Sequence, residues 1–134
     1  MFKLDARLAA DTHWVGDLPL CHVLLMNDSQ FPWLILVPRI ADVTEVFELP
    51  EEQQQQLLNE SMLVSKALKN QTQCDKINIG AIGNVVSQLH IHHVARFKDD
   101  VAWPKPVWGA QPAVAYTQPQ SEALISTYRQ LLAL

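Results

Sequence analysis

The sequence predicts an α+β fold with an antiparallel sheet of about five strands, one long central helix and a C-terminal helix. Two short apolar runs in the first third of the chain are joined by about six residues, as in neighbouring antiparallel strands. A long stretch with helical spacing follows, and two further strand-like segments then precede a second helical stretch. This order of elements indicates an α+β domain.

The expected strands are apolar segments bounded by turn-forming residues. Gly16 and Pro19 end the first segment, residues 27–30 form a turn after the second, and Pro38 stops the third. The last two segments enclose a glycine-containing connection that we expect to be short and tight. The five strands are expected over residues 13–17, 21–26, 33–37, 76–84 and 88–96.

The long helix is expected over about residues 51–70. Glu51 and Glu52 lie in its first turn, where the helix dipole favours negative charge, and apolar residues recur with helical spacing after them. A terminal helix is expected over residues 121–134, with Ser121 near its cap, and a short amphipathic stretch over residues 4–10.

Composition limits what the chain can be. Its 134 residues fit a single domain, 1–134, and 49% hydrophobic with 18% charged residues is a globular balance. The net charge of −4 disfavours non-specific binding to nucleic acid. No apolar run approaches the roughly 20 residues of a membrane-spanning helix, and two scattered cysteines form no disulfide framework. We expect a cytoplasmic protein that binds neither a membrane nor nucleic acid.

Three of the five histidines fall within residues 88–94. On a strand, Gln88, His90 and His92 project from one face, with His93 on the other. Two imidazoles spaced in this way lie about 6 to 7 Å apart at Cα, so that one phosphate can touch both. A neutral imidazole is a competent nucleophile, and a protonated neighbour can donate to a phosphoryl oxygen. The preceding loop, with Gly83 and Asn84, can bring backbone N–H groups to the same anion.

A His-x-His pair on a strand is also typical of zinc ligands. A third ligand would have to come from His13, His22, Asp99 or Asp100 through folding, because no histidine follows His93. We therefore expect no metal and no cofactor, and we interpret His93 as a polar residue on the far face of the strand.

Residues 78–96 resemble the signature of the histidine-triad (HIT) family, His-φ-His-φ-His-φ-φ, in which φ is apolar. The likeness extends upstream to residues 24–28 and 33–39, which are similar to the family's strand, turn, strand and proline–basic ending. Residues 97–100 and 103–109 resemble a bacterial subgroup of HIT-like proteins.

The resemblance implies a HIT-like fold and a nucleotide hydrolase or transferase that acts on a phosphoramidate or a dinucleoside polyphosphate. By the same resemblance, His90 forms a covalent nucleotidyl intermediate on the α-phosphorus and His92 contacts the phosphate. Gly83 and Asn84 fall in the phosphate-side loop, and members of the family are generally homodimers with a sheet continued across the interface. The family holds the ribose where this chain has Asn27 or Asp28.

The chain departs from the family pattern at two positions. Gln88 stands at the first triad position and Trp33 near the place of another histidine. Glutamine hydrogen-bonds but does not titrate, so the catalytic role of Gln88 is reduced or reorganised. The alternatives are a nucleotide-binding module with little or no turnover and a metal-binding His-x-His protein.

Three further residues, two tryptophans and one arginine, each have two possible roles. Trp103 and Trp108 either stack on a base or pack over a core edge or a dimer interface. Arg96 either binds phosphate or makes a surface ion pair with Asp99 or Asp100.

Overall fold

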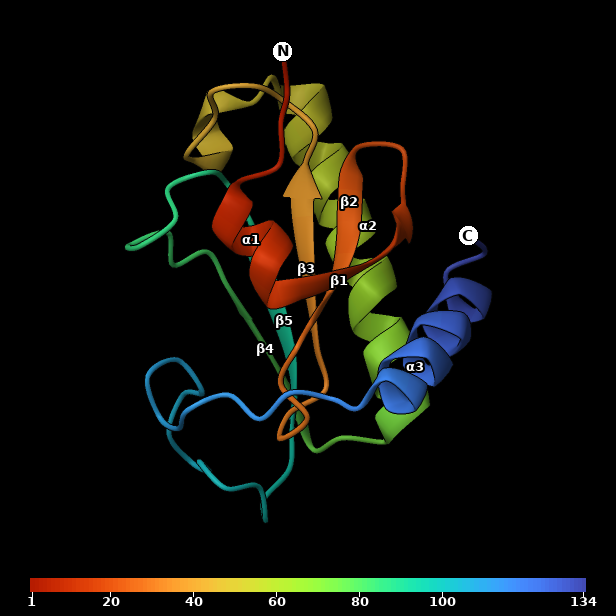
Figure 1. The fold of residues 1–134 in the computed structure, drawn as a ribbon. Helices are drawn as coiled ribbons and strands as arrows, with labels where there is room; N and C mark the ends of the chain where they lie inside the picture. Colours follow the sequence, from red (N-terminus) through yellow and green to blue (C-terminus); the bar gives the residue numbers. More distant parts are fainter.

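The computed structural model describes all residues, 1–134, as one antiparallel sheet with helices on both of its faces (Figure 1). The five strands lie in the order β1-β2-β3-β5-β4. The strands are β1 (Thr12–Asp17), β2 (Cys21–Met26), β3 (Trp33–Pro38), β4 (Lys76–Gly80) and β5 (Ile91–Arg96), and the helices are α1 (Ala6–Asp11), the 3₁₀ turn η1 (Val46–Glu48), α2 (Glu51–Thr72) and α3 (Gln118–Leu131).

The register of the sheet decides which side chains meet at its centre. Strand β3 pairs with β5 so that Ile35 lies opposite His92 and Trp33 opposite Val94. Side chains alternate between faces, so Trp33, Ile35 and His92 share one face, and His93 points to the other. Strands β1 and β4 are the two edges, and β1 is irregular between Trp14 and Gly16.

Each face of the sheet carries its own core. Helices α2 and α3 cover one face, where Val64, Leu68 and Tyr128 belong to a cluster of 19 buried residues. Helix α1 and residues 97–110 cover the other, where Leu8 and Val107 belong to a cluster of nine that includes Trp33. The second face is the one on which His92 projects, so the short helix and the long loop build the surroundings of the histidines.

The fold class, the central helix and the C-terminal helix are confirmed, and several boundaries are corrected. Helix α2 runs to Thr72 and ends where Gln73 adopts a left-handed conformation. Helix α3 begins at Gln118 because Thr117, not Ser121, caps it through a capping box. Strand β5 begins at Ile91 rather than at residue 88, and β4 ends at Gly80. The connection between them is therefore a loop over residues 81–90, not a tight turn.

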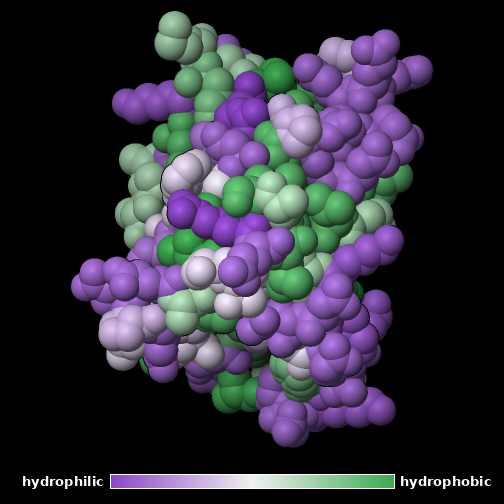
Figure 2. All heavy atoms as spheres, turned by 90° about the vertical axis from the view of Figure 1, so that its right-hand side faces the viewer, coloured by the Kyte–Doolittle hydropathy of each residue, from purple (hydrophilic) through white to green (hydrophobic).

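Large apolar side chains remain exposed on several elements. Leu58 and Met62 of α2 are 53% and 42% exposed, and Ile79 of the edge strand β4 is 46% exposed. Figure 2, which views the side of the molecule that carries α3, shows hydrophobic atoms reaching the surface between hydrophilic ones. None of the helices has the length and apolar character needed to cross a membrane.

Candidate active site

His90 and His92 lie side by side where the 81–90 loop enters β5. Their ring centroids are 4.9 Å apart and the rings meet edge to face at 68°. His92 is held by the β3–β5 pairing, and His90 is the last residue before the strand. Both histidines are largely buried, at 6% and 7% exposed, yet each lines a hollow open to the surface. The predicted pairing of the two imidazoles on one face is therefore present.

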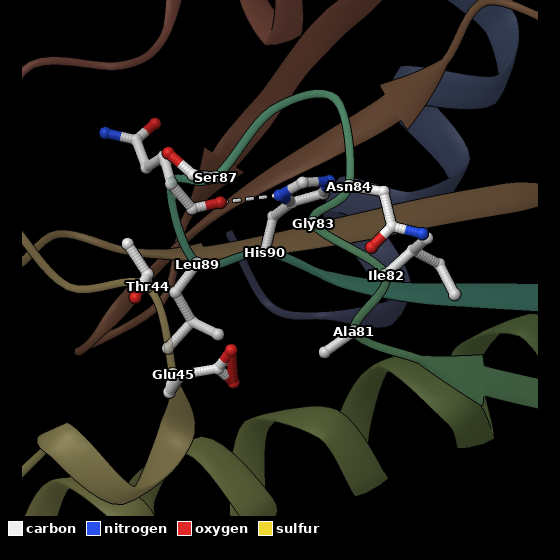
Figure 3. A pocket seen from close by; sticks show the side chains of 10 residues that line it. Thr44, Glu45, Ala81, Ile82, Gly83, Asn84, Ser87, Leu89 and His90 are labelled. Atoms are coloured by element: carbon white, nitrogen blue, oxygen red, sulfur yellow. Dashed lines mark hydrogen bonds between the residues drawn. The ribbon is translucent and has the colours of Figure 1, made fainter.

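The orientation of the His90 ring is set by its own backbone neighbourhood. Its Nδ1 lies 2.6 Å from the carbonyl oxygen of Gln88, the contact drawn as a dashed line in Figure 3. A carbonyl oxygen only accepts, so Nδ1 carries the proton and donates it. The Nε2 atom of His90 consequently keeps its lone pair, which is the form of imidazole that attacks an electrophile.

His92 has the opposite tautomer. The indole Nε1–H of Trp33 donates to Nδ1 of His92 over 3.0 Å, so Nδ1 is the acceptor and Nε2 carries the proton. Burial, reinforced by the neighbouring imidazoles of His90 and His93, lowers the pKa of His92 to about 3. His92 is thus a neutral donor at physiological pH, which corrects the expectation of a protonated imidazole at this position.

Trp108 packs against the outer side of the histidine pair. Its ring lies 5.4 Å from that of His92 and 6.3 Å from that of Trp33, edge to face in both cases. Trp108 therefore packs over the edge of the core beside the two histidines, and its stacking on a base stays a prediction. Trp103 instead packs against the guanidinium of Arg96 at 5.6 Å.

A buried ion pair anchors the loop that carries Trp108. Both carboxylate oxygens of Asp100 accept from Arg96, at 2.8 and 3.0 Å, and Asp100 also accepts from the backbone N–H groups of Phe97, Ala102 and Trp103. The Arg96 side chain is 2% exposed. The expected surface ion pair is therefore wrong in its location, because the pair is buried and Arg96 is fully engaged within the fold.

Two hollows meet at His90. The first, about 250 Å³, is largely polar and lies between residues 44–45 and the 81–90 loop (Figure 3). The second, about 450 Å³, is largely apolar and has a volume typical of ligand pockets. Gly83 and Asn84 line both hollows, and their role toward a phosphate stays a prediction; Gly83 has a φ of 65°, which suits glycine. The apolar hollow is also lined by residues from several parts of the chain: Arg7, Leu8, Ala10, Asp11, Met26, Ile35, Val85, Val86, His92 and Trp108.

The side chain of Gln88 does not join the histidine row. It lies before the strand, and its amide binds the backbone of Lys3 and Asp5. The expectation that residues 88, 90 and 92 form one strand row therefore holds only for the two histidines. The backbone carbonyl of Gln88 accepts a hydrogen bond from His90.

Asn27 and Asp28 hold the segment that leads to α3. Asn27 Oδ1 accepts from the N–H of Tyr116 at 3.0 Å, and Asp28 Oδ1 accepts from that of Val114 at 3.3 Å. Neither residue lines either hollow beside His90. The role of these two residues toward a ribose stays a prediction.

His93 lies away from both hollows. His93 is fully buried on the opposite face, where its Nε2 lies 2.7 Å from the hydroxyl of Ser61 on α2. It is a polar residue on the far face, as interpreted, but it is covered by α2.

The zinc alternative requires a third ligand beside the two histidines. No group of three or more His, Cys, Asp or Glu side chains is arranged to hold a metal ion.

Sequence reasoning missed the contribution of residues distant in the chain. The polar hollow contains Thr44 and Glu45, and the apolar hollow contains α1 side chains; no motif marks either set. Trp33 was noticeable only as a departure from a family pattern, and its bond to His92 depends on the strand register.

Comparison with known proteins agrees with this geometry. Residues 7–99 match the HIT domain. A histidine triad protein from Marinobacter aquaeolei is 51% identical, with a TM-score of 0.97 over 99% of this chain and 97% of the other. One from Bradyrhizobium japonicum is 47% identical, with a TM-score of 0.95 over 98% of each chain. One from Sinorhizobium meliloti is 46% identical, with a TM-score of 0.94 over 96% of each. The comparison with curated proteins gave no match. The chain belongs to the histidine triad (HIT) family.

Proposed function

We propose that this protein is a nucleotide hydrolase or transferase in which Nε2 of His90 attacks the α-phosphorus of a nucleotide. The observation that carries the proposal is the opposite polarity of the two neighbouring imidazoles. His90 presents a lone pair because its Nδ1–H is held by the Gln88 carbonyl, and His92 presents an N–H because its Nδ1 is held by Trp33. One phosphate can meet a nucleophile and a hydrogen-bond donor together.

The reaction divides into two displacements. In the first, the lone pair of His90 Nε2 forms a P–N bond, and the bond from phosphorus to the leaving group breaks with its electron pair. The leaving amine of a phosphoramidate takes up a proton from solvent and departs as the neutral amine. The Gln88 carbonyl accepts from Nδ1–H and so stabilises the positive charge on the His90 ring. The Nε2–H of His92 donates to a phosphoryl oxygen. In the second, water or another acceptor attacks phosphorus and releases its proton to solvent, and the P–N bond electrons return to Nε2.

The two hollows suggest where the halves of the substrate lie. The apolar hollow beside Met26, Ile35 and Trp108 suits a nucleoside, and the polar hollow beyond His90 suits the leaving group. No Lys or Arg lines the polar hollow, whereas the carboxylate-bearing Glu45 does. A polyphosphate leaving group would meet no cation there. This charge pattern favours a phosphoramidate, whose leaving group is an amine, over a dinucleoside polyphosphate.

The proposal includes a homodimer with a sheet continued across the interface. Strand β4 is an edge strand, and the half-exposed Ile79 on it leaves an apolar side chain without cover. Leu58 and Met62, one helical turn apart on α2, are also exposed. We expect light scattering to give twice the chain mass, and a charged residue at position 79 to shift the protein towards the monomer.

The test is a substrate panel measured with matched variants. Nucleoside 5′-phosphoramidates and dinucleoside polyphosphates with each common base are incubated with the wild-type protein, His90→Asn and His13→Asn. We expect turnover of at least one phosphoramidate by the wild type and by His13→Asn, and none by His90→Asn, with unchanged circular dichroism in all three.

Two outcomes contradict the proposal. Turnover that persists in His90→Asn places the chemistry elsewhere. Nucleotide binding with no product from any compound of the panel indicates a binding module instead.

A further inference from the structure

Gln88 joins the nucleophile to a segment more than 80 residues away in the chain. Its side-chain oxygen accepts from the N–H of Asp5 at 2.9 Å, and its side-chain NH₂ donates to the carbonyl of Lys3 at 2.8 Å. Residues 3 and 5 of an extended segment present a C=O and an N–H on the same side, and one amide satisfies both. The side chain of Gln88 therefore holds this segment as a neighbouring strand would.

The held segment leads directly into α1. Asp5 is the N-cap of that helix, and its carboxylate accepts from the N–H groups of Arg7 and Leu8. Helix α1 has only six residues, far below the length at which a helix is stable alone. Its position therefore depends on Asp5, on the burial of Leu8 and on the attachment of the preceding segment.

Helix α1 forms part of the wall of the apolar hollow. Arg7, Leu8, Ala10 and Asp11 line the hollow together with His90, His92 and Trp108. Displacement of the segment at residues 3–5 would loosen this wall without moving the histidines, because the ring of His90 is oriented by the backbone carbonyl of residue 88.

We propose that Gln88 is a positioning residue that clamps the N-terminal segment and thereby shapes the nucleoside half of the site. The position that would carry the first triad histidine then acts through two separate groups. Its carbonyl orients the nucleophile, and its side chain sets the affinity for the nucleoside. The part of this inference that concerns affinity rests on the proposed function; the clamp itself does not.

The test compares Gln88→Ala, Gln88→Glu and Gln88→His with the wild type and with Gln55→Ala, an exposed glutamine on α2. Hydrogen exchange of residues 2–12 is followed first, in the absence of any nucleotide. Loss of one or two hydrogen bonds should speed exchange at the Asp5 amide and in α1 roughly fivefold or more in Gln88→Ala. Gln88→Glu, which keeps the acceptor but loses the donor, should lie between Gln88→Ala and the wild type, and Gln55→Ala should match the wild type.

The second readout is the affinity for the 5′-monophosphates of adenosine, guanosine, cytidine and uridine. Gln88→Ala should weaken the tightest of these roughly fivefold or more, and with an active substrate it should raise KM much more than it lowers kcat. Unchanged exchange over residues 2–12 in Gln88→Ala overturns the clamp, whatever the activity. Faster exchange with unchanged affinity and KM overturns its role in the site. Faster exchange in Gln88→Ala, together with a wild type that binds none of the nucleotides, upholds the clamp and contradicts the proposed function.

Discussion

The indole of Trp33 donates to Nδ1 of His92 across 3.0 Å, from the strand next to the one that carries the histidine. The two residues are diagonal neighbours on one sheet face, within reach of an aromatic side chain. This contact makes Nε2 of His92 the protonated nitrogen. A tryptophan on the neighbouring strand thereby sets the tautomer of this histidine.

Replacing Trp33 with Phe keeps an aromatic ring but removes the donor. His92 then samples both tautomers, so we expect kcat to fall roughly five- to tenfold with a smaller change in nucleotide affinity. The direct measurement is the ¹⁵N spectrum of labelled histidine side chains. The wild type should show His92 with a bare Nδ1 and a protonated Nε2, and the variant should show a mixture.

Trp14→Phe is the matched control, because Trp14 is an exposed indole that donates to Asp17 on β1. It should leave both the His92 signals and turnover unchanged. An unaltered His92 spectrum in Trp33→Phe would show that the indole does not set the tautomer.

Two buried histidines make the fold sensitive to mild acid. Burial lowers the pKa of His92 to about 3 and that of His93 to about 4, against an ordinary value of 6.5. Between these values the unfolded chain binds protons that the folded protein does not, so stability falls as the pH is lowered. The free energy of unfolding should drop progressively from about pH 6.5 to about pH 4, by an amount on the order of 3 kcal/mol per histidine.

Urea unfolding at a series of pH values measures this slope. His93→Gln removes one of the two groups, so its stability should depend less steeply on pH over the same window. If the free energy of unfolding depends on pH equally steeply in the variant and the wild type, other groups cause the acid sensitivity. The carboxyl of Asp100, with its pKa lowered to about 2 by the bond to Arg96, adds a loss only at lower pH.

The Arg96–Asp100 pair should be a main support of the loop that carries Trp108. Asp100→Asn removes the charge that compensates a guanidinium with 2% exposure. Leaving a buried charge unpaired costs about 3 kcal/mol or more, so the midpoint of urea unfolding should fall markedly. Asp99→Asn, one residue away, is the control and should change stability by less than about 0.5 kcal/mol. A loss for Asp100→Asn as small as that of the control would contradict the role of this pair.

Local patterns in the sequence predict most helices and strands well. They do not predict contacts between residues that are distant in the chain. The apolar runs at residues 21–26 and 33–37 and the helical spacing after Pro50 correspond to β2, β3 and α2. The spacing of His90 and His92 placed their rings together. The alternation of side chains between the two sheet faces does not extend back to residue 88, although the sequence predicts a strand there. The side-chain amide of Gln88 instead binds a segment 83 to 85 residues away in the chain.

The tautomers and the burial of charges could not be read from the sequence either. The hydrogen bond between Trp33 and His92 joins residues 59 positions apart in the chain, and it follows from the register of β3 and β5. Arg96 next to two aspartates has the pattern of a surface ion pair, and only the packing of Phe31 and Trp103 over its guanidinium shows that it is buried.

In the proposed mechanism, the imidazole of His90 becomes covalently bonded to phosphorus. Mass spectrometry of the wild-type protein, quenched during turnover of the best nucleoside phosphoramidate, detects such an adduct, and mapping of the modified peptide locates it. We expect one added nucleoside monophosphate on His90, absent from His90→Asn. Steady turnover with an adduct on another residue, or with direct transfer to water and inversion at a chiral phosphorus, would contradict it.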